Sequence, residues 1–328
     1  MRYIFGILLS FTIIITANAQ QVFNKKEPLV HTFSIVAKDM LTGEMVVAVQ
    51  SHWFSVGTSV PWAEAGVGAI ATQSFTDKSY GPKGLALLKQ GFTAKQVLDS
   101  LTKADAGRDV RQVAIIDNEG NVAAHTGAKC IQYAKHILGA HFSVQSNMML
   151  GSTVCENMAN AFEKSSNKPL GERVLLALEA AQKAGGDIRG MQSAAMITVP
   201  GKTMEAWNNK SIDLRVDDNP QPLVELRRLY TIHLAYEHMN NGDLAVEKNK
   251  MADAMAEYHA AMKLFPGNLE MQYWTAITLA NNKQIDKAAT MLKAIYIKNK
   301  NWLELTKRLP TVGLLTVSDV DFKKLTGM

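Results

Sequence analysis

The sequence has little of what several common functional classes require. Only two cysteines occur in 328 residues, too few for a disulfide framework or a four-cysteine zinc site. The 9 prolines and 22 glycines are too few for a fibrous chain, and 47% hydrophobic residues are too many for a disordered one. Lys and Arg exceed Asp and Glu by only 35 to 30 and form no dense basic block, so nucleic-acid binding is not expected.

Conventional catalytic motifs are absent as well. The sequence contains no G-x-S-x-G elbow, no P-loop, no H-E-x-x-H and no G-x-G-x-x-G after an expected strand. The eight histidines show no metal-ligand spacing supported by Asp or Cys. We therefore expect neither a metal site nor a cofactor.

The N-terminus carries the pattern of a secretory signal peptide. Met1-Arg2 precedes an apolar run, Ile4–Ile15, and Ala17-Asn18-Ala19 gives an Ala-x-Ala end. The alternative is a membrane anchor, but the run is shorter than the roughly 20 residues that cross a bilayer. We expect cleavage after residue 19, which lowers the net charge from +5 to +4 through loss of Arg2. No other segment is apolar enough to cross a membrane, so an exported protein, periplasmic or secreted, is expected.

Export bears on the two cysteines. Cys130 and Cys155 would meet an oxidising compartment, where a disulfide can form. The sequence does not show whether they are adjacent. The alternative, two small buried apolar residues, is favoured.

After a linker or propeptide over residues 20–30, the chain shows two different patterns of secondary structure. Residues 31–222 mix strands and helices, and residues 223–328 are nearly all helix. The expected strands are Thr32–Lys38, Glu44–Ser51, Gly66–Gln73, Val110–Asp117, Asn121–Thr126, Phe142–Gln145, Ser193–Val199 and Ile212–Val216. The expected helices are Leu85–Gln90, Ala94–Lys103 with Thr93 as its cap, Asn147–Lys164 and Leu170–Lys183. This order favours a layered α+β fold over alternating βαβ winding.

The helical region contains an internal repeat. Breaks are expected at 240–243, 266–268 and 281–283, and Ala254 and Tyr258 recur 34 residues later as Ala288 and Leu292. The pattern resembles one full and one degenerate tetratricopeptide repeat. Such repeats bind peptides or partner proteins on a concave face, although two units could instead cap the first domain.

The segment from His31 to about Leu229 resembles a bacterial family of unknown function placed in the N-terminal-nucleophile (Ntn) hydrolase superfamily. The resemblance runs through residues 32–37 (Thr-Phe-Ser-Ile-Val-Ala), 60–63, 66–69, 71–73, 80–82, 84–85, 111–112, 126–130, 145, 147–148, 185–187, 189–190, 192–195 and 213–218. It implies an αββα sandwich, which agrees with the element order read from the residues.

The resemblance also implies a mechanism. An Ntn hydrolase uses a Thr, Ser or Cys that begins the mature chain, with its own α-amino group as base. Thr32 is the candidate nucleophile and Ser34 the reserve. The position that holds an acid in proteasome-like relatives is part of Gln50-Ser51-His52, and no lysine lies between Ser51 and Asp77. His52 or Asp39 would then serve as base. The alternative is that Thr32 and Ser34 are strand-forming residues only.

Further polar residues are expected to line a cleft between the sheets and bind substrate: Arg111, Gln145, Asn147, Asp187, Arg189 and Gln192. Arg189 and Asp187 could equally stabilise a turn. The aromatic group Trp53, Phe54 and Trp62 indicates core or a homo-oligomer contact.

Two functions follow from these patterns. One is an exported amide hydrolase acting on a peptide or another amide. The other is a non-catalytic binding or scaffold protein that uses its helical repeats to hold a protein partner.

Overall fold

The computed structural model describes residues 29–30 and 32–327. The expected signal peptide and the cleavage point before residue 20 lie outside these residues, as does His31. The described part of the chain forms two compact units, one ending at Leu226 and one beginning at Arg227. It is a mixed α+β protein whose first unit holds two antiparallel sheets and whose second unit is helical.

One sheet of the first unit, called here sheet A, has the order β1–β5–β6–β7, with β4 also pairing with β5. Its strands are β1 (Leu29–Val30), β4 (Pro61–Glu64), β5 (Gly68–Phe75), β6 (Arg111–Asp117) and β7 (Val122–Thr126). Sheet B has the order β11–β10–β3–β2–β9–β8. Its strands are β2 (Thr32–Lys38), β3 (Met45–Ser51), β8 (Lys135–Gly139), β9 (Phe142–Ser146), β10 (Ser193–Val199) and β11 (Ile212–Val216).

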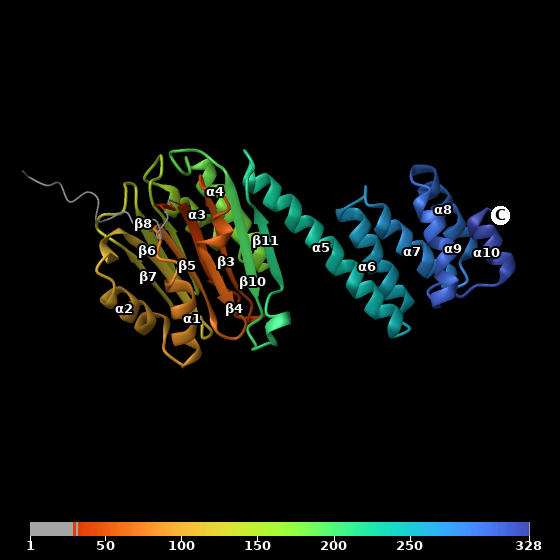
Figure 1. Ribbon diagram of the computed structural model, residues 1–328, viewed down its shortest axis with the longest axis horizontal. Helices are drawn as coiled ribbons and strands as arrows, with labels where there is room; N and C mark the ends of the chain where they lie inside the picture. The colour runs from red at the N-terminus through yellow and green to blue at the C-terminus, as the bar shows by residue number, and fades with distance from the viewer. Residues whose placement is uncertain (1–28, 31, 328) are drawn as a thin grey trace, which may run out of the picture. The chain divides into compact units, whose positions relative to one another are not determined.

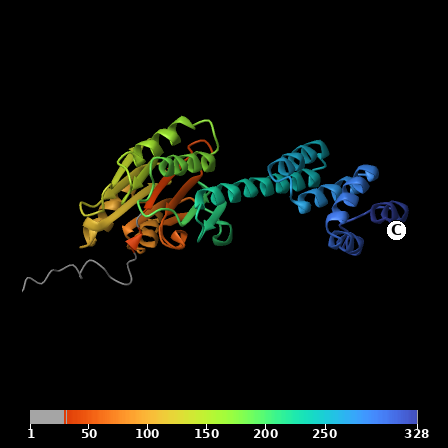
Figure 2. The same cartoon turned by 90° about the horizontal axis from the view of Figure 1, so that it is seen from above.

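Helices cover the outer face of each sheet, and the two sheets face each other. The helices of this unit are α1 (Tyr80–Lys89), α2 (Ala94–Ala104), α3 (Val154–Lys164) and α4 (Leu170–Lys183), with short 3-10 turns at Val56–Thr58, Arg108–Val110 and Ala206–Asn208. Helices α1 and α2 pack on sheet A, and α3 and α4 pack on sheet B (Figures 1 and 2). The layers therefore follow the order helix, sheet, sheet, helix.

Residue alternation along each strand explains these layers. In β5, Ala69 and Ala71 lie in the core between the sheets, whereas Ile70 faces α1 and α2. Neighbouring residues of a strand point to opposite faces, so a strand buried on both faces is apolar throughout. Glycine is needed where α1 meets sheet A, because a Cβ on Gly81 would lie 2.2 Å from Cδ2 of Trp62. Trp53 and Trp62 pack against the two cores as expected, whereas Phe54 is exposed.

Several expected elements need correction. The helix expected from Asn147 begins only at Val154, because Asn147 donates its N–H to the carbonyl of Thr32 and Leu150 donates to Gly186. Helix α1 begins at Tyr80 rather than Leu85, and strands β4 and β8 were not expected. The cap of α2 is confirmed: Thr93 and Gln96 form a reciprocal capping box.

Helix α5 (Pro222–Glu247) begins in the first unit and continues into the second. The second unit then contains α6 (Met251–Leu264), α7 (Leu269–Asn281), α8 (Ile285–Lys298), α9 (Asn301–Arg308), a 3-10 turn (Leu309–Val312) and α10 (Asp319–Thr326). The breaks expected at 266–268 and 281–283 are confirmed. The break at 240–243 is wrong, because α5 runs through it. Gly242 serves close packing there, since a Cβ on it would lie 2.3 Å from Cε1 of Tyr258.

The positions that repeat after 34 residues are buried in both copies. Ala254 and Tyr258 on α6, and Ala288 and Leu292 on α8, are all fully buried. Helix α7 contacts both α6 and α8. The repeated residues are therefore packing residues of α6 and α8, the helices on either side of α7 in the sequence. None of the helices in the described residues combines the length and apolar character that crossing a bilayer requires.

Candidate functional site

The space between the sheets is apolar over most of its length and polar at one end. At this end the inward-facing residues of several strands are amides and hydroxyls rather than Val, Ala or Ile. We call this group the amide network: Ser34, Gln73, Gln112, Thr126, His136, Ser143, Gln145 and Asn147. Its residues come from both sheets, so the network connects them.

The first half of the network centres on the Ser34 hydroxyl. Ser143 donates to Oε1 of Gln145 at 3.1 Å, and Nε2 of Gln145 donates to Oγ of Ser34 at 2.6 Å. Ser34 in turn donates to Oε1 of Gln73 at 2.6 Å. All four side chains are fully buried. Burial in a medium of low polarity makes each of these hydrogen bonds expensive to lose.

The second half leads to a histidine. Nε2 of Gln73 donates to Oε1 of Gln112 at 2.7 Å, and that oxygen also accepts from Asn147 at 2.9 Å. Nε2 of Gln112 donates to Oγ1 of Thr126 at 2.9 Å, and Oγ1 lies 2.8 Å from Nδ1 of His136. The Thr126 hydroxyl can donate to Nδ1 of His136 or accept from it, according to the tautomer of the imidazole.

Thr126 and His136 also line a cavity of about 420 Å³ at the surface, together with Cys130 and Lys135. Burial lowers the pKa of His136, and the neighbouring His125 lowers it further. The imidazole is thus kept neutral near pH 7 and can accept a proton. Burial raises the pKa of the Cys130 thiol, which disfavours its reactive thiolate.

Thr32 lies beside the amide network at the first position of β2. It is fully buried, and its carbonyl accepts from the Asn147 N–H at 3.1 Å and from Nε2 of Gln73 at 3.3 Å. In the register of the sheet it lies opposite Ser51 of β3. The alternation of β2 places Thr32 and Ser34 on the face toward sheet A.

Of the two expected bases, the structure brings only His52 near Thr32. His52 follows Ser51, its N–H donates to Oδ2 of Asp187 at 3.1 Å, and its buried Nδ1 has no hydrogen-bond partner among the described residues. Asp39 follows the other end of β2, seven residues from Thr32 or roughly 23 Å along an extended strand. Its carboxylate accepts from the N–H groups of Leu41 and Thr42. The expectation that Asp39 could act as base for Thr32 is therefore wrong.

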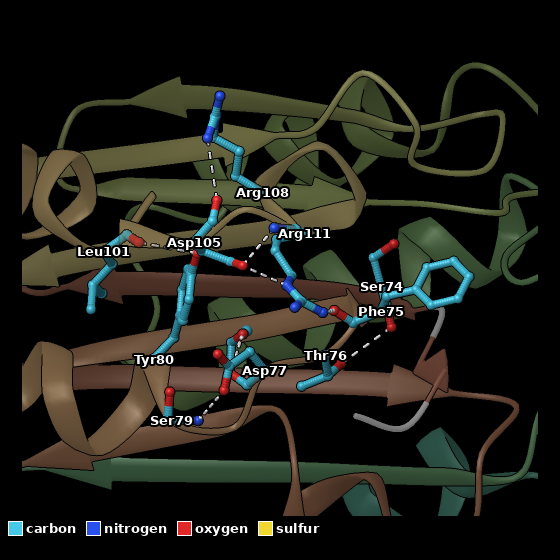
Figure 3. A network of polar contacts seen from close by, with 12 residues as sticks. Ser74, Phe75, Thr76, Asp77, Ser79, Tyr80, Leu101, Asp105, Arg108 and Arg111 are labelled. Atoms are coloured by element: carbon cyan, nitrogen blue, oxygen red, sulfur yellow. Dashed lines mark hydrogen bonds and ion pairs between the residues drawn. The ribbon is translucent and has the colours of Figure 1, made fainter. Parts of the chain in front are cut away.

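Arg111 holds the end of β5 from the outer side of sheet A (Figure 3). Its Nε donates to Oδ2 of Asp105 at 2.8 Å, and one terminal nitrogen donates to the carbonyl of Phe75 at 2.6 Å. Tyr80 donates to the same carboxylate at 2.9 Å. Burial alone would raise the pKa of Asp105, but the hydrogen bonds from Arg111, Gly107 and Tyr80 outweigh it and hold the pKa below its usual value.

Asp187, Arg189 and Gln192 form a second group next to His52 and to the segment that follows Asn147: the His52 N–H donates to Asp187, and the Ile188 N–H donates to the carbonyl of Met148. Both oxygens of the buried Asp187 carboxylate accept from Arg189, at 3.0 Å from Nε and 2.7 Å from a terminal nitrogen. The sequence allowed either substrate binding or stabilisation of a turn for Asp187 and Arg189. These contacts within one turn have the geometry of the second alternative. Gln192 donates to Asp218 at 3.1 Å on the exposed side.

The predicted site residues thus separate into groups. Ser34, Gln145 and Asn147 join the amide network with Thr32 beside it, while Arg111 lies behind sheet A. Sequence reasoning missed other members of the network: Gln73, Gln112, Thr126, His136 and Ser143. Three of these, Gln73, Gln112 and Thr126, stand in segments that carry the family resemblance, and that was the available signal.

The chemistry of the network is that of neutral donors and acceptors. No three His, Cys, Asp or Glu side chains gather as a metal-binding group within residues 32–327. Both cysteines are free thiols: Cys130 donates to the carbonyl of Arg111, and Cys155 is buried beside Ser146. Buried amide N–H groups can stabilise the negative oxygen that forms when a carbonyl is attacked.

Comparison with known proteins identifies the family. The model of the family of unknown function DUF1028 matches residues 32–226, more than half of the chain. A crystal structure of a protein from Silicibacter pomeroyi, labelled with the same family, is 31% identical, with a TM-score of 0.55. The match covers 61% of this chain and 84% of that one. The chain therefore belongs to the DUF1028 family. A comparison with curated proteins found no match.

Proposed function

We propose that the first unit is an amide hydrolase of the Ntn type, with Thr32 as its nucleophile. One observation carries this proposal: a hydroxyl residue stands at the first position of a central strand, beside a buried group of amide N–H donors. The helix–sheet–sheet–helix order of the layers supports assignment to the αββα Ntn class. The reaction class that these groups suit is acyl transfer from an amide.

The proposed mechanism begins with cleavage of the His31–Thr32 bond. The Thr32 hydroxyl attacks the carbonyl of residue 31, the C–N bond breaks to give an ester and a free α-amine, and water hydrolyses the ester. The freed amine has an ordinary pKa of about 7.7–8.0 and takes the hydroxyl proton when Thr32 attacks a substrate amide. The leaving amine receives that proton, and a second water releases the acyl group.

Intact-mass measurement on purified full-length protein tests this mechanism. The wild type and Thr32→Ser are expected to give a mature chain that begins at residue 32, whereas Thr32→Ala is expected to remain joined to residue 31. A β-lactone probe then reports the nucleophile, because ring opening by a hydroxyl adds the whole mass of the probe as an ester. A wild-type chain that stays joined at residue 31 and takes up no probe would overturn the proposal.

A second candidate function is a non-catalytic binding protein. It is favoured by the neutral character of the amide network, in which amides and hydroxyls satisfy one another. In this case the wild type and Thr32→Ala both remain joined to residue 31, and the substitution leaves the fold and ligand binding unchanged. The mass measurement therefore separates the two functions directly.

We further propose that the chain is exported to the periplasm or secreted after loss of residues 1–19. The tetratricopeptide-like helices would then hold a peptide or protein partner. Support comes from the buried repeat positions and from two grooves of about 620 and 710 Å³ in the helical unit. Mass measurement of protein recovered from the periplasm or medium tests the export step, since an unprocessed N-terminus would contradict it.

A further inference from the structure

The chain crosses from one sheet to the other immediately before Thr32. Leu29 and Val30 form β1, which pairs antiparallel with Phe75 and Ser74 of sheet A. Thr32 begins β2 of sheet B. The two residues that pair with β5 thus lie on the acyl side of the His31–Thr32 bond.

Strand β1 occupies only part of one edge of β5. On this edge β4 pairs with residues 68–71 of β5, and β1 pairs with residues 74–75. The other edge is paired with β6 along residues 68–74. Departure of β1 would leave backbone groups at 74–75 open for another extended chain, as in recognition by strand addition. We call this two-residue edge the β5 slot.

The structure holds the β5 slot in a fixed conformation. Arg111, itself anchored by Asp105, donates to the carbonyl of Phe75 at 2.6 Å (Figure 3). Ser74 has a φ of +74°, in the left-handed region that residues other than glycine rarely adopt. Such disfavoured conformations persist where the surroundings impose them, and they are common at ligand-binding sites. Arg111 therefore acts as a positioning residue for the slot.

We infer that the substrate is an extended peptide whose acyl part replaces β1 in the β5 slot. This inference rests on the proposed function, because maturation and turnover then use the same nucleophile. In both reactions the residues on the acyl side of the bond must lie where β1 lies. The chain's own sequence before the cut, Leu-Val-His, is thus a template for a substrate. Thr32 attacks the carbonyl of the third residue, the amine leaves with a proton, and water hydrolyses the ester to free the peptide acid.

The test uses acetyl-Leu-Val-His-aminomethylcoumarin and mature protein verified by mass. Hydrolysis is measured by release of the fluorescent amine. Along one strand of an antiparallel pair, residues alternate. The N–H and C=O of one residue both bind the neighbouring strand, and those of the next residue point away from it. N-methylation of the Val or Leu nitrogen is therefore expected to behave differently at the two positions. One methylated peptide should lose about tenfold or more in kcat/KM, and the other should stay within about twofold.

The outcomes separate the inference from the proposed function. A mature chain that takes up the β-lactone but does not hydrolyse the peptide overturns the inference alone. Equal hydrolysis of the parent and both methylated peptides also overturns it, because the backbone pairing would then be unused. A chain that remains joined at residue 31 overturns both. Arg111→Lys is a second check: KM for the peptide should rise, and an unchanged KM would count against Arg111 as the positioning residue of the slot.

Discussion

The Ser34 hydroxyl provides the sharpest test of the amide network. Replacing Ser34 by Ala removes one oxygen that accepts from Gln145 and donates to Gln73, both at 2.6 Å. Neither Nε2 of Gln145 nor Oε1 of Gln73 makes another hydrogen bond within the described residues, so both would be left buried without a partner. Each lost bond of this kind costs about 1–2 kcal/mol, so Ser34→Ala is expected to lower the free energy of unfolding by about 2–4 kcal/mol.

Ser143 offers a matched control on the neighbouring strand. It is also a fully buried serine, and Ser143→Ala deletes the same atom. It makes a single, longer bond, 3.1 Å to Oε1 of Gln145, so its loss is expected to cost about 1 kcal/mol. Urea unfolding of the full-length variants, followed by circular dichroism, measures both changes. A cost for Ser34→Ala no greater than that for Ser143→Ala would refute the assignment of Ser34 as the centre of the network.

Two further predictions concern charge. Because the folded-state pKa of His136 lies below the unfolded value of about 6.5, the unfolded chain binds more protons in the acid range. The contribution of neutral His136 to the stability of the fold is therefore present above pH 6.5 and is lost as the pH falls toward the folded-state pKa. Between pH 7.5 and pH 5.5 the urea midpoint should fall less for His136→Asn than for the wild type. An equal fall in both proteins would contradict the lowered pKa of His136. Arg111→Met leaves the Asp105 carboxylate without its buried partner and should lower the free energy of unfolding by about 2–4 kcal/mol. The control Lys95→Met removes an exposed ion pair and should lower it by less than about 0.5 kcal/mol. Similar thermal midpoints for the two variants would count against a structural role for Arg111.

Local signals in the sequence predicted the elements whose residues decide their own conformation. Helix α4 was predicted with its observed bounds, Leu170–Lys183, because its apolar residues recur with helical spacing. Thr93 was predicted as a cap because Thr at that position binds the free N–H groups of a helix. Strand β2 was predicted over Thr32–Lys38 from a run of strand-forming residues. In each case the pattern and the structure concern the same few residues.

Elements fixed by distant contacts were not predictable in this way. Asn147 was assigned to a helix, but the carbonyl of Thr32, far away in sequence, holds its N–H instead. Strand β8 is an edge strand with a partly exposed face, so it lacks the apolar alternation that marks a strand. The candidate site has the same limitation. Gln73 and Gln112 become neighbours only through the β5–β6 register. The separation of Asp39 from Thr32, by contrast, follows from the length of the predicted strand itself.

The proposed role of Thr32 places two opposing physical demands on it in this fold. In the structure its side chain is fully buried, and its carbonyl accepts from Asn147 and Gln73. As the proposed nucleophile it would need a free amine and space for an acyl group. Removal of β1 would meet both needs in one step, because the segment that blocks the amine also fills the β5 slot. The neutral network suits this change, since amides and hydroxyls need no charged partner when the segment leaves. The same cleavage that creates the nucleophile would therefore create the substrate-binding edge.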